Sequence, residues 1–351
     1  TLRNMLHAVD DMADKGIGMM HTASGVGFPL DLDVTLETNF GKGLDSGFQT
    51  RLFFQTMNLD KIQKRKLPRV GGCFATALDG CFGSEDAALR QPYANHPQNR
   101  GILFHSDEEV IRFAKRANRE GLQIEMHAIG DAAFDQAVMA IEAALKDFPR
   151  QDHRHGIIHA CLPTEEGLQK CAELGIQIPL QPAFLMWNLE PLEYLYRILG
   201  NRAERISPLR KMTDMGIVLS GGSDAPCTLP DPIAGIHAAC NHYVPEQSLT
   251  IPEALKLFTC NAAWTTFDEK ERGLREELFA KENALKAEGA QKEDVYRKSY
   301  EEALAEQNAA LERRYAGLER QLREALTAKE RERQETWTAR EQEWLAQRDT
   351  L

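Results

Sequence analysis

Short apolar runs alternate with amphipathic stretches along the chain as far as Gly273. The apolar runs are rich in β-branched and aromatic residues and are bounded by turn-forming residues, as expected of buried strands. The expected strands are 17–21, 50–55, 71–77, 122–127, 156–160, 176–180 and 216–220. This alternation predicts βαβ units and a parallel sheet, built either as a doubly wound sheet or as a (β/α)8 barrel.

Two of the intervening helices have clear starting points. Ser106 is followed three residues later by Glu109, and Thr250 is followed by Glu253, which is the pattern of a capping box. Pro252 lies in the first turn of the second helix, where a missing N–H costs nothing. We therefore expect helices to begin directly after Ser106 and Thr250.

Two features favour the barrel over the doubly wound sheet. No glycine-rich phosphate loop follows an early strand, which argues against a dinucleotide-binding sheet. Polar residues follow the C-terminal ends of several expected strands, where the loops of a barrel build the active site. The seven expected strands are one fewer than a closed (β/α)8 barrel contains.

The composition changes sharply near Gly273. Residues 274–351 contain no Pro, His or Cys and are dominated by Glu, Arg, Lys, Ala, Gln and Leu, which is typical of a long exposed helix or a coiled coil. A heptad spacing separates Leu304, Leu311, Leu318 and Ala325. Two interpretations remain open, a weak coiled coil or a single solvated helix with charge pairs. The sequence thus predicts a domain at 1–273 and a charged helical extension at 274–351.

Charge and cysteine content restrict the partners. The formal net charge of −11 makes nucleic acid and anionic membrane surfaces unfavourable partners, because a phosphate-binding surface must be basic. No apolar run approaches membrane length. The seven cysteines show neither metal-type pairing nor disulfide-scaffold density, and no secretory signal is evident, so we expect a cytoplasmic protein. The chain opens on Thr1 as a fragment would.

Three side chains carry the candidate chemistry. His127, His159 and Asp224 each lie at or just past the end of an apolar run. Two imidazoles and a carboxylate from separate strand ends are the donors of a hydrolytic Zn²⁺, Fe²⁺ or Mn²⁺ site. Each residue alone also has a structural explanation, as a hydrogen-bonded histidine or as part of a Gly-Gly-Ser-Asp turn. Their occurrence in order, on what would be strands five, six and eight if one strand is missing upstream, makes the metal site the stronger interpretation.

Neighbouring polar residues are interpreted differently. Asp131 is expected to cap the following helix or to orient the imidazole of His127. His153 and His155 are interpreted as loop residues or as residues that lead into a strand, and not as ligands. Four aromatic residues have two open interpretations, an apolar substrate pocket or ordinary core packing: Phe184, Trp187, Tyr194 and Tyr196.

Six segments together resemble a known family: 78–84 (LDGCFGS), 125–131 (EMHAIGD), 155–160 (HGIIHA), 181–184 (QPAF), 221–226 (GGSDAP) and 261–264 (NAAW). From about Thr1 to Arg272 the chain resembles the metal-dependent amidohydrolase superfamily, in its amidohydrolase-3 branch, and is similar to hydrolases of the N-substituted formamide deformylase type. The resemblance implies a distorted (β/α)8 barrel with one or two metal ions at the strand C-termini. It also implies that His127 and His159 are metal ligands and that Asp224 is both ligand and general base.

The chain departs from the family pattern in three places. The family begins its barrel with a His-x-His strand, whereas here that spacing occurs only at 153–155, so the first strand would lie before Thr1. Region 73–77 has no lysine to bridge two metals, so a single ion is expected, with zinc the first choice; Cys73 or Cys81 are alternative thiolate ligands, or simply buried small residues. After 268–273 a helical tail replaces the expected β-sandwich strands.

Two functional hypotheses follow. In the first, the chain is a metal-dependent amidohydrolase that cleaves a non-peptide C–N bond of a small molecule, an amide or formamide, through metal-activated water. In the second, the barrel is truncated and inactive, and the helical tail is an interaction or homo-oligomerisation module. The fold expected in both is a (β/α)8 TIM-type barrel that lacks its first strand, followed by an all-α segment.

Overall fold

The structure is a computed structural model that describes residues 2–44 and 47–271, together with parts of the C-terminal segment at 305–306, 309, 313, 316–317, 320, 323–324, 327–338 and 340–342. The chain separates into two compact units, Thr1–Arg275 and Glu276–Leu351. Each unit is described by itself. None of the helices in the described ranges is long and apolar enough to cross a membrane.

The first unit is built on parallel strands. They are β1 (Met19–Ser24), β2 (Gln49–Phe54), β3 (Arg69–Gly72), β4 (Gln123–Ala128), β5 (Gly156–His159), β6 (Ile178–Leu180) and β7 (Leu219–Gly221). The first five form one sheet in chain order, β6 pairs with β7, and a bridge between Gly156 and Gln177 continues the order from β5 to β6. Every pairing is parallel. The seven expected strands are therefore confirmed, and within 2–44 and 47–271 the sheet is open between β7 and β1.

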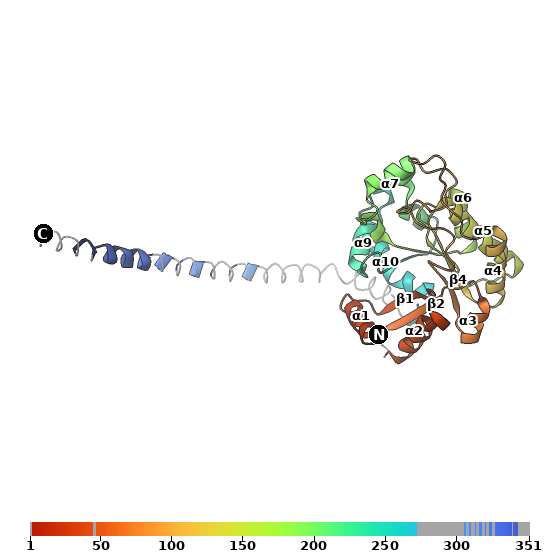
Figure 1. Ribbon diagram of the computed structural model, residues 1–351, viewed down its shortest axis with the longest axis horizontal. Helices are drawn as coiled ribbons and strands as arrows, with labels where there is room; N and C mark the ends of the chain where they lie inside the picture. Colours follow the sequence, from red (N-terminus) through yellow and green to blue (C-terminus); the bar gives the residue numbers. More distant parts are fainter. Residues whose placement is uncertain are drawn as a thin grey trace, which may run out of the picture. The chain divides into compact units, whose positions relative to one another are not determined.

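Helices follow the strands and cover the outside of the sheet. They are α1 (Leu2–Ala13), α2 (Leu32–Gly43), α3 (Leu59–Arg65), α4 (Asp107–Arg119), α5 (Asp131–Asp147), α6 (Glu165–Leu174), α7 (Leu192–Leu199), α8 (Leu209–Asp214), α9 (Pro232–Cys240), α10 (Ile251–Phe258) and α11 (Cys260–Thr265). Figure 1 shows α4, α5 and α6 outside β4. The expected capping boxes begin α4 and α10. The arrangement is that of a TIM-like α/β fold, which confirms the fold class at this level.

One strand boundary was predicted incorrectly. The expected strand at 71–77 ends at Gly72, and the chain then turns away from the sheet. The turn is held by the Oε1 atom of Gln55, which accepts a hydrogen bond from the Phe74 N–H (2.8 Å), and by the Thr76 hydroxyl, which donates to the Gly72 carbonyl (3.1 Å). Because the first of these partners directly follows the neighbouring strand β2, the apolar run alone could not indicate the end of β3.

The two faces of the sheet differ in polarity. On β4, Ile124 and Met126 are fully buried in the large apolar core. Gln123, Glu125 and His127 alternate with them and therefore face the concave side. Burial raises the pKa of the Glu125 carboxyl to about 8, and this group accepts a hydrogen bond from the Gln177 side chain (2.9 Å). The concave side is thus a buried polar interior. Its end at the carboxyl ends of the strands carries the candidate site residues.

The other end of this interior is closed by α11 and the residues that follow it. The Thr265 hydroxyl donates to Gln177 (2.7 Å), and Thr266 is hydrogen-bonded to His21 of β1 (3.0 Å). Asp268 forms an ion pair with Arg51 of β2. These contacts join the first strands to the end of the unit, so that polar groups of the interior are satisfied by a segment distant in sequence.

The described part of the second unit is helical over residues 327–338. Its side chains are exposed, and Arg331 pairs with Glu335 one turn later (3.1 Å). The heptad residues Leu304, Leu311, Leu318 and Ala325 lie outside the described residues. The coiled coil stays a prediction.

Candidate metal centre

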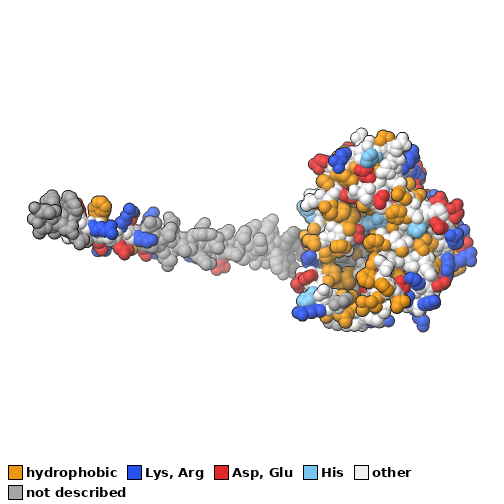
Figure 2. Space-filling view, in the orientation of Figure 1, with side chains coloured by type: hydrophobic (Ala, Val, Ile, Leu, Met, Phe, Trp, Pro, Cys, Tyr) orange, Lys and Arg blue, Asp and Glu red, His pale blue; other side chains and the backbone are white. Residues whose placement is uncertain are grey.

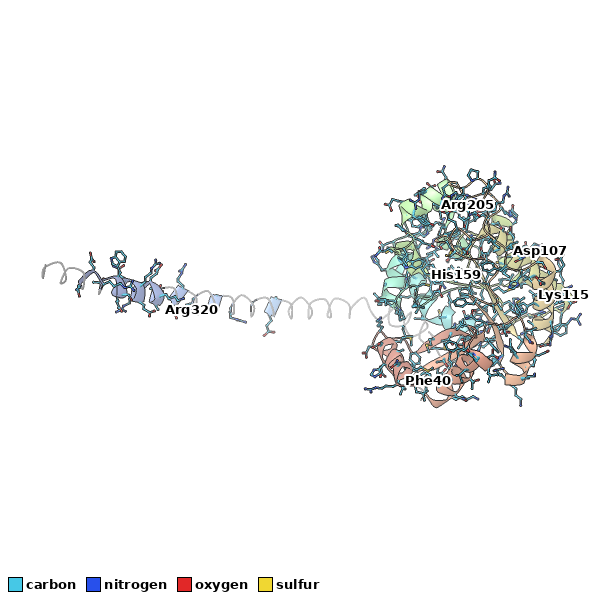
Figure 3. The ribbon with its side chains drawn as sticks, in the orientation of Figure 1. Phe40, Asp107, Lys115, His159, Arg205 and Arg320 are labelled. Carbon is cyan, nitrogen blue, oxygen red and sulfur yellow. The ribbon has the colours of Figure 1, made fainter. Side chains whose placement is uncertain are left out.

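The candidate residues lie at the carboxyl ends of four strands. His127 is on β4 and His159 is the last residue of β5, whereas Cys73 follows β3 and Asp224 follows β7. Because the carboxyl ends of parallel strands meet at one edge of a sheet, residues far apart in sequence converge there. Figure 3 labels His159 within the first unit.

The two predicted histidines are in contact. Their ring centroids are 4.5 Å apart and the planes are nearly perpendicular, at 80°. Cys73 completes the group, since its Sγ atom is 3.5 Å from Nε2 of His159. The donor atoms of Cys73, His127 and His159 all lie within 4.8 Å of one another. The sequence named Cys73 only as an alternative, and its position directly after β3 is the signal that supports it.

Each imidazole is oriented through one ring nitrogen. Nδ1 of His159 donates to Oε1 of Gln181 (2.6 Å), and Nε2 of His127 donates to the carbonyl oxygen of Gly80 (3.0 Å). A neutral imidazole has one N–H and one lone pair, so the lone pairs remain on Nε2 of His159 and Nδ1 of His127. Nδ1 of His127 is buried and has no hydrogen-bond partner. Nδ1 of His127 is therefore unused, whereas Nε2 of His159 and Sγ of Cys73 are hydrogen-bonded to each other. A cation bound by these three atoms would replace that bond, with the orienting partners of both imidazoles already in place.

Asp79 is a positioning residue that the sequence did not single out. Its buried carboxylate accepts the N–H groups of Ile129 (3.0 Å), Gly130 (2.8 Å) and Ala88 (2.8 Å), and it lies 3.4 Å from Nε2 of His127. It thereby fixes the turn after β4 that carries His127. An Asp-Gly pair within the 78–84 segment was the available signal, but it is also that of an ordinary turn.

The role expected of Asp131 was wrong. Gly130 is the N-cap of α5, and Asp131 lies in the first turn, where its Oδ1 accepts the N–H of Arg90 (2.7 Å). His153 and His155 also lie outside the group, as expected. Nε2 of His153 is bonded to the Leu174 carbonyl (2.8 Å), and Nε2 of His155 is bonded to Asn118 (3.0 Å).

Asp224 faces the group from the β7 side. It is not among the three residues whose donor atoms lie within 4.8 Å of one another. Asp224 nevertheless interacts with the group electrostatically. The pKa of the Cys73 thiol is raised chiefly by burial and further by the charge of Asp224, and His127 has a lowering effect on the pKa of Asp224. Burial is the larger influence on Asp224 and raises the pKa of its carboxyl.

Burial and backbone strain both mark this edge. Burial, with a smaller effect of His127, lowers the pKa of His159 well below its usual range, so the ring is neutral. His159 has φ of 71° and Asp224 has φ of 51°. Non-glycine residues rarely adopt this left-handed conformation, which costs about 1–3 kcal/mol and is concentrated at functional sites. Two of the ten non-glycine residues with positive φ in the described part of the chain are thus residues that the sequence selected for chemistry.

Comparisons with known proteins identify similar sequences. The chain is 31% identical over 229 residues to the amidohydrolase YtcJ of Bacillus subtilis, a match covering 61% of this chain and 42% of that protein. It is 28% identical over 221 residues to the N-substituted formamide deformylase of Arthrobacter pascens, covering 58% and 38%. The chain thus spans about two fifths of the length of these curated relatives.

A solved structure is also similar. An uncharacterized metal-dependent hydrolase from Pyrococcus furiosus superposes with a TM-score of 0.65 at 27% identity, covering 76% of this chain and 55% of that chain. The profile of the family described as "Amidohydrolase family" matches residues 60–277, which is more than half of the chain. This protein belongs to the amidohydrolase family.

Proposed function

We propose that this protein is a metal-dependent hydrolase that cleaves the C–N bond of a small amide or formamide. The observation that carries the proposal is the group of Cys73, His127 and His159, in which one donor, Nδ1 of His127, is buried without a partner. A buried polar atom without a partner is costly, and a bound ion would satisfy it. Family membership supports the hydrolytic chemistry.

The donor set fits one divalent ion. Cys73 would offer Sγ, His127 its Nδ1 and His159 its Nε2. Nitrogen and sulfur donors favour Zn²⁺ over the harder cations, and three protein ligands leave a position open for water or substrate. Fe²⁺ and Mn²⁺ are the other candidates. Residues 73–77 include no lysine to bridge a second ion.

The residues around the ion would have different roles in the reaction. A divalent metal supplies Lewis-acid polarisation of a carbonyl and lowers the pKa of water. Asp224, on the side of the group nearest β7, would accept a proton from the attacking water and return it to the amide nitrogen. The water oxygen bonds to the carbonyl carbon, the C–N bond breaks, and an acid and an amine leave. Gln181 and Asp79 would keep the two imidazoles in place.

The inactive-barrel hypothesis keeps one supporting observation. In residues 2–44 and 47–271 no strand carries a His-x-His pair, and the single histidine of β1, His21, is hydrogen-bonded to Thr266. These residues therefore offer no such pair to a family site that depends on one. The three-residue group is nevertheless sufficient for a single-ion site.

Metal retention separates the two hypotheses. The purified protein is loaded with Zn²⁺, dialysed and analysed for metal, and hydrolysis of N-substituted formamides is followed by formate release. We expect about one Zn²⁺ per chain, lost in Cys73→Ala, His127→Ala and His159→Ala. The control is His237→Ala, which removes an exposed histidine on α9. Zinc retention that is unaffected by all three substitutions would contradict the proposed site.

A further inference from the structure

The helix that precedes β1 has more apolar surface than the first unit covers. Among the residues of α1 only Val9 is buried, and Met5 and Met12 are half-buried against the small core cluster to which α2 also contributes. Leu2 (56% exposed) and Leu6 (50%) lie on the surface. Burial by the rest of the chain therefore does not account for the two leucines.

The sequence of α1 places its side chains in two adjacent rows. One row is apolar and has a spacing of four, three and four residues: Leu2, Leu6, Val9 and Ala13. The row beside it is displaced by one residue and carries Arg3, His7 and Asp10, all exposed. Side chains at these spacings share one side of a helix. An apolar row with a charged margin is typical of a helix that packs against another helix.

The charges of α1 are the reverse of those that a helix dipole favours. Its first turn has no acidic residue and its last turn no basic one. Instead Arg3 lies in the first turn, whereas Asp10 and Asp11 lie in the last. Helix α4 shows the favourable pattern, with three acidic residues in its first turn and two arginines in its last. Within one chain, the charge distribution of α1 is therefore unfavourable.

The surroundings of α1 leave its exposed side open. Within 2–44 and 47–271 no strand pairs with the outer edge of β1, the strand that follows α1. Figure 1 places α1 at the margin of the first unit. Figure 2 shows hydrophobic side chains on the face that is turned to the viewer, including the part where Figure 1 labels α1.

A second copy of α1, running antiparallel, fits both the apolar row and the charges. When two antiparallel copies meet about a twofold axis between residues 6 and 7, Arg3 of each copy faces Asp10 of the other. The leucines at position 6 then meet near the axis. The positive end of each helix dipole lies beside the acidic end of the other helix. A parallel arrangement would instead place Arg3 beside its own copy, where the two cations repel.

We propose that α1 is an interface between two copies of this chain, packed antiparallel through Leu2 and Leu6 and joined by two ion pairs between Arg3 and Asp10. This interface is independent of the candidate metal centre and of the proposed hydrolysis. A pair of 12-residue helices is smaller than a standard interface of about 1,200–2,000 Å². We therefore expect a reversible dimer, with a Kd on the order of 10–100 μM.

Charge reversal tests the interface through amide hydrogen exchange in α1 of the full chain. This readout is local, so association through the second unit does not imitate it. Arg3→Glu and Asp10→Arg each bring like charges together across the axis, and each should speed exchange of α1 at about 200 μM protein by about 5- to 10-fold. The double variant Arg3→Glu/Asp10→Arg restores the opposite pairs and should restore slow exchange. Arg112→Glu, an equal charge change on the exposed face of α4, is the control.

The direction of the change separates the dimer from a purely intramolecular effect. In an isolated α1 both single substitutions suit the helix dipole, so they would slow exchange. Leu6→Gln should also speed exchange of α1, whereas Leu189→Gln, at an exposed leucine after β6, should not. Slower exchange in the single charge variants, or no rescue in the double variant, would overturn the inference. So would a chain that sediments as a monomer at about 200 μM.

Discussion

The two ends of the polar interior differ in whether their buried polar groups have hydrogen-bond partners. At the end closed by α11, Gln177 and Thr265 are hydrogen-bonded to each other, and Arg51 is paired with Asp268. At the other end, His127 keeps a buried nitrogen without a partner, and His159 adopts a strained backbone conformation. Both ends bury polar groups, but only one leaves donor atoms unused. Satisfied polar groups hold the fold together, whereas an unsatisfied one indicates where a ligand belongs. Backbone strain does not separate the two ends, since Phe267 beside α11 also has a positive φ of 69°.

The largest effect should come from Asp224, the proposed base at the open end. Asp224→Asn removes the proton acceptor and keeps the size of the side chain, so kcat for a formamide substrate should fall about 10²- to 10⁴-fold. Because the three-residue group is untouched, at least part of the bound zinc should remain. Steady-state kinetics and metal analysis on the same sample provide the measurement. A variant with undiminished kcat would remove Asp224 from the proposed chemistry.

Asp79 has two roles, because its hydrogen bonds stabilise the fold and also hold the turn next to the candidate metal site. Asp79→Ala leaves three backbone N–H groups without their acceptor, and we expect the free energy of unfolding to fall by about 3–5 kcal/mol. The control is Asp231→Ala, which removes a single N-cap bond from Asp231 to the Ala234 N–H and should cost about 1 kcal/mol. Urea denaturation measures both. Equal losses in the two variants would show that the Asp79 bonds add nothing beyond an ordinary cap.

His21, at the closed end, should contribute to the pH dependence of the free energy of unfolding. Burial, followed by the charge of Arg69, lowers the pKa of His21 to about 4, against 6.5 in the unfolded chain. The unfolded state therefore binds a proton more readily than the folded state. The stabilisation that depends on a neutral His21 is complete above about pH 6.5, and up to about 3 kcal/mol of it is lost as the pH falls toward 4. His21→Gln should flatten the stability profile between these pH values. A profile of unchanged slope in that variant would contradict the assignment.

The smallest expected effect concerns the orientation of His159. Gln181→Ala removes the acceptor for Nδ1 of His159 and should weaken zinc binding about 10- to 100-fold with little change in the free energy of unfolding. Gln169→Ala, an exposed glutamine on α6, is the matched control. Competition with a zinc chelator measures the affinity. Unchanged affinity would mean that His159 is oriented by packing alone.

Most of the fold followed from local patterns. The strands were predicted because a short apolar run bounded by turn-forming residues is a property of each segment. The starts of α4 and α10 were predicted because a capping box lies within four residues. The end of β3 was missed because Gln55, which directly follows β2, holds the turn after β3. His127 and His159 were selected by their places at strand ends, and the structure brings them together. Their role as ligands, like that of Asp224, stays a prediction.

By itself the sequence determined the order of the strands, the segments of the amidohydrolase family and the two histidines, because periodicity and short motifs are local. Only the tertiary structure decided that Cys73 joins those histidines, that Asp79 holds the turn beneath His127, and that Phe184 and Trp187 stack outward from His159. Each of these facts depends on a contact between segments that follow different strands. Such contacts exist only once parallel strands bring their carboxyl ends to one edge, and that convergence is a property of the whole sheet.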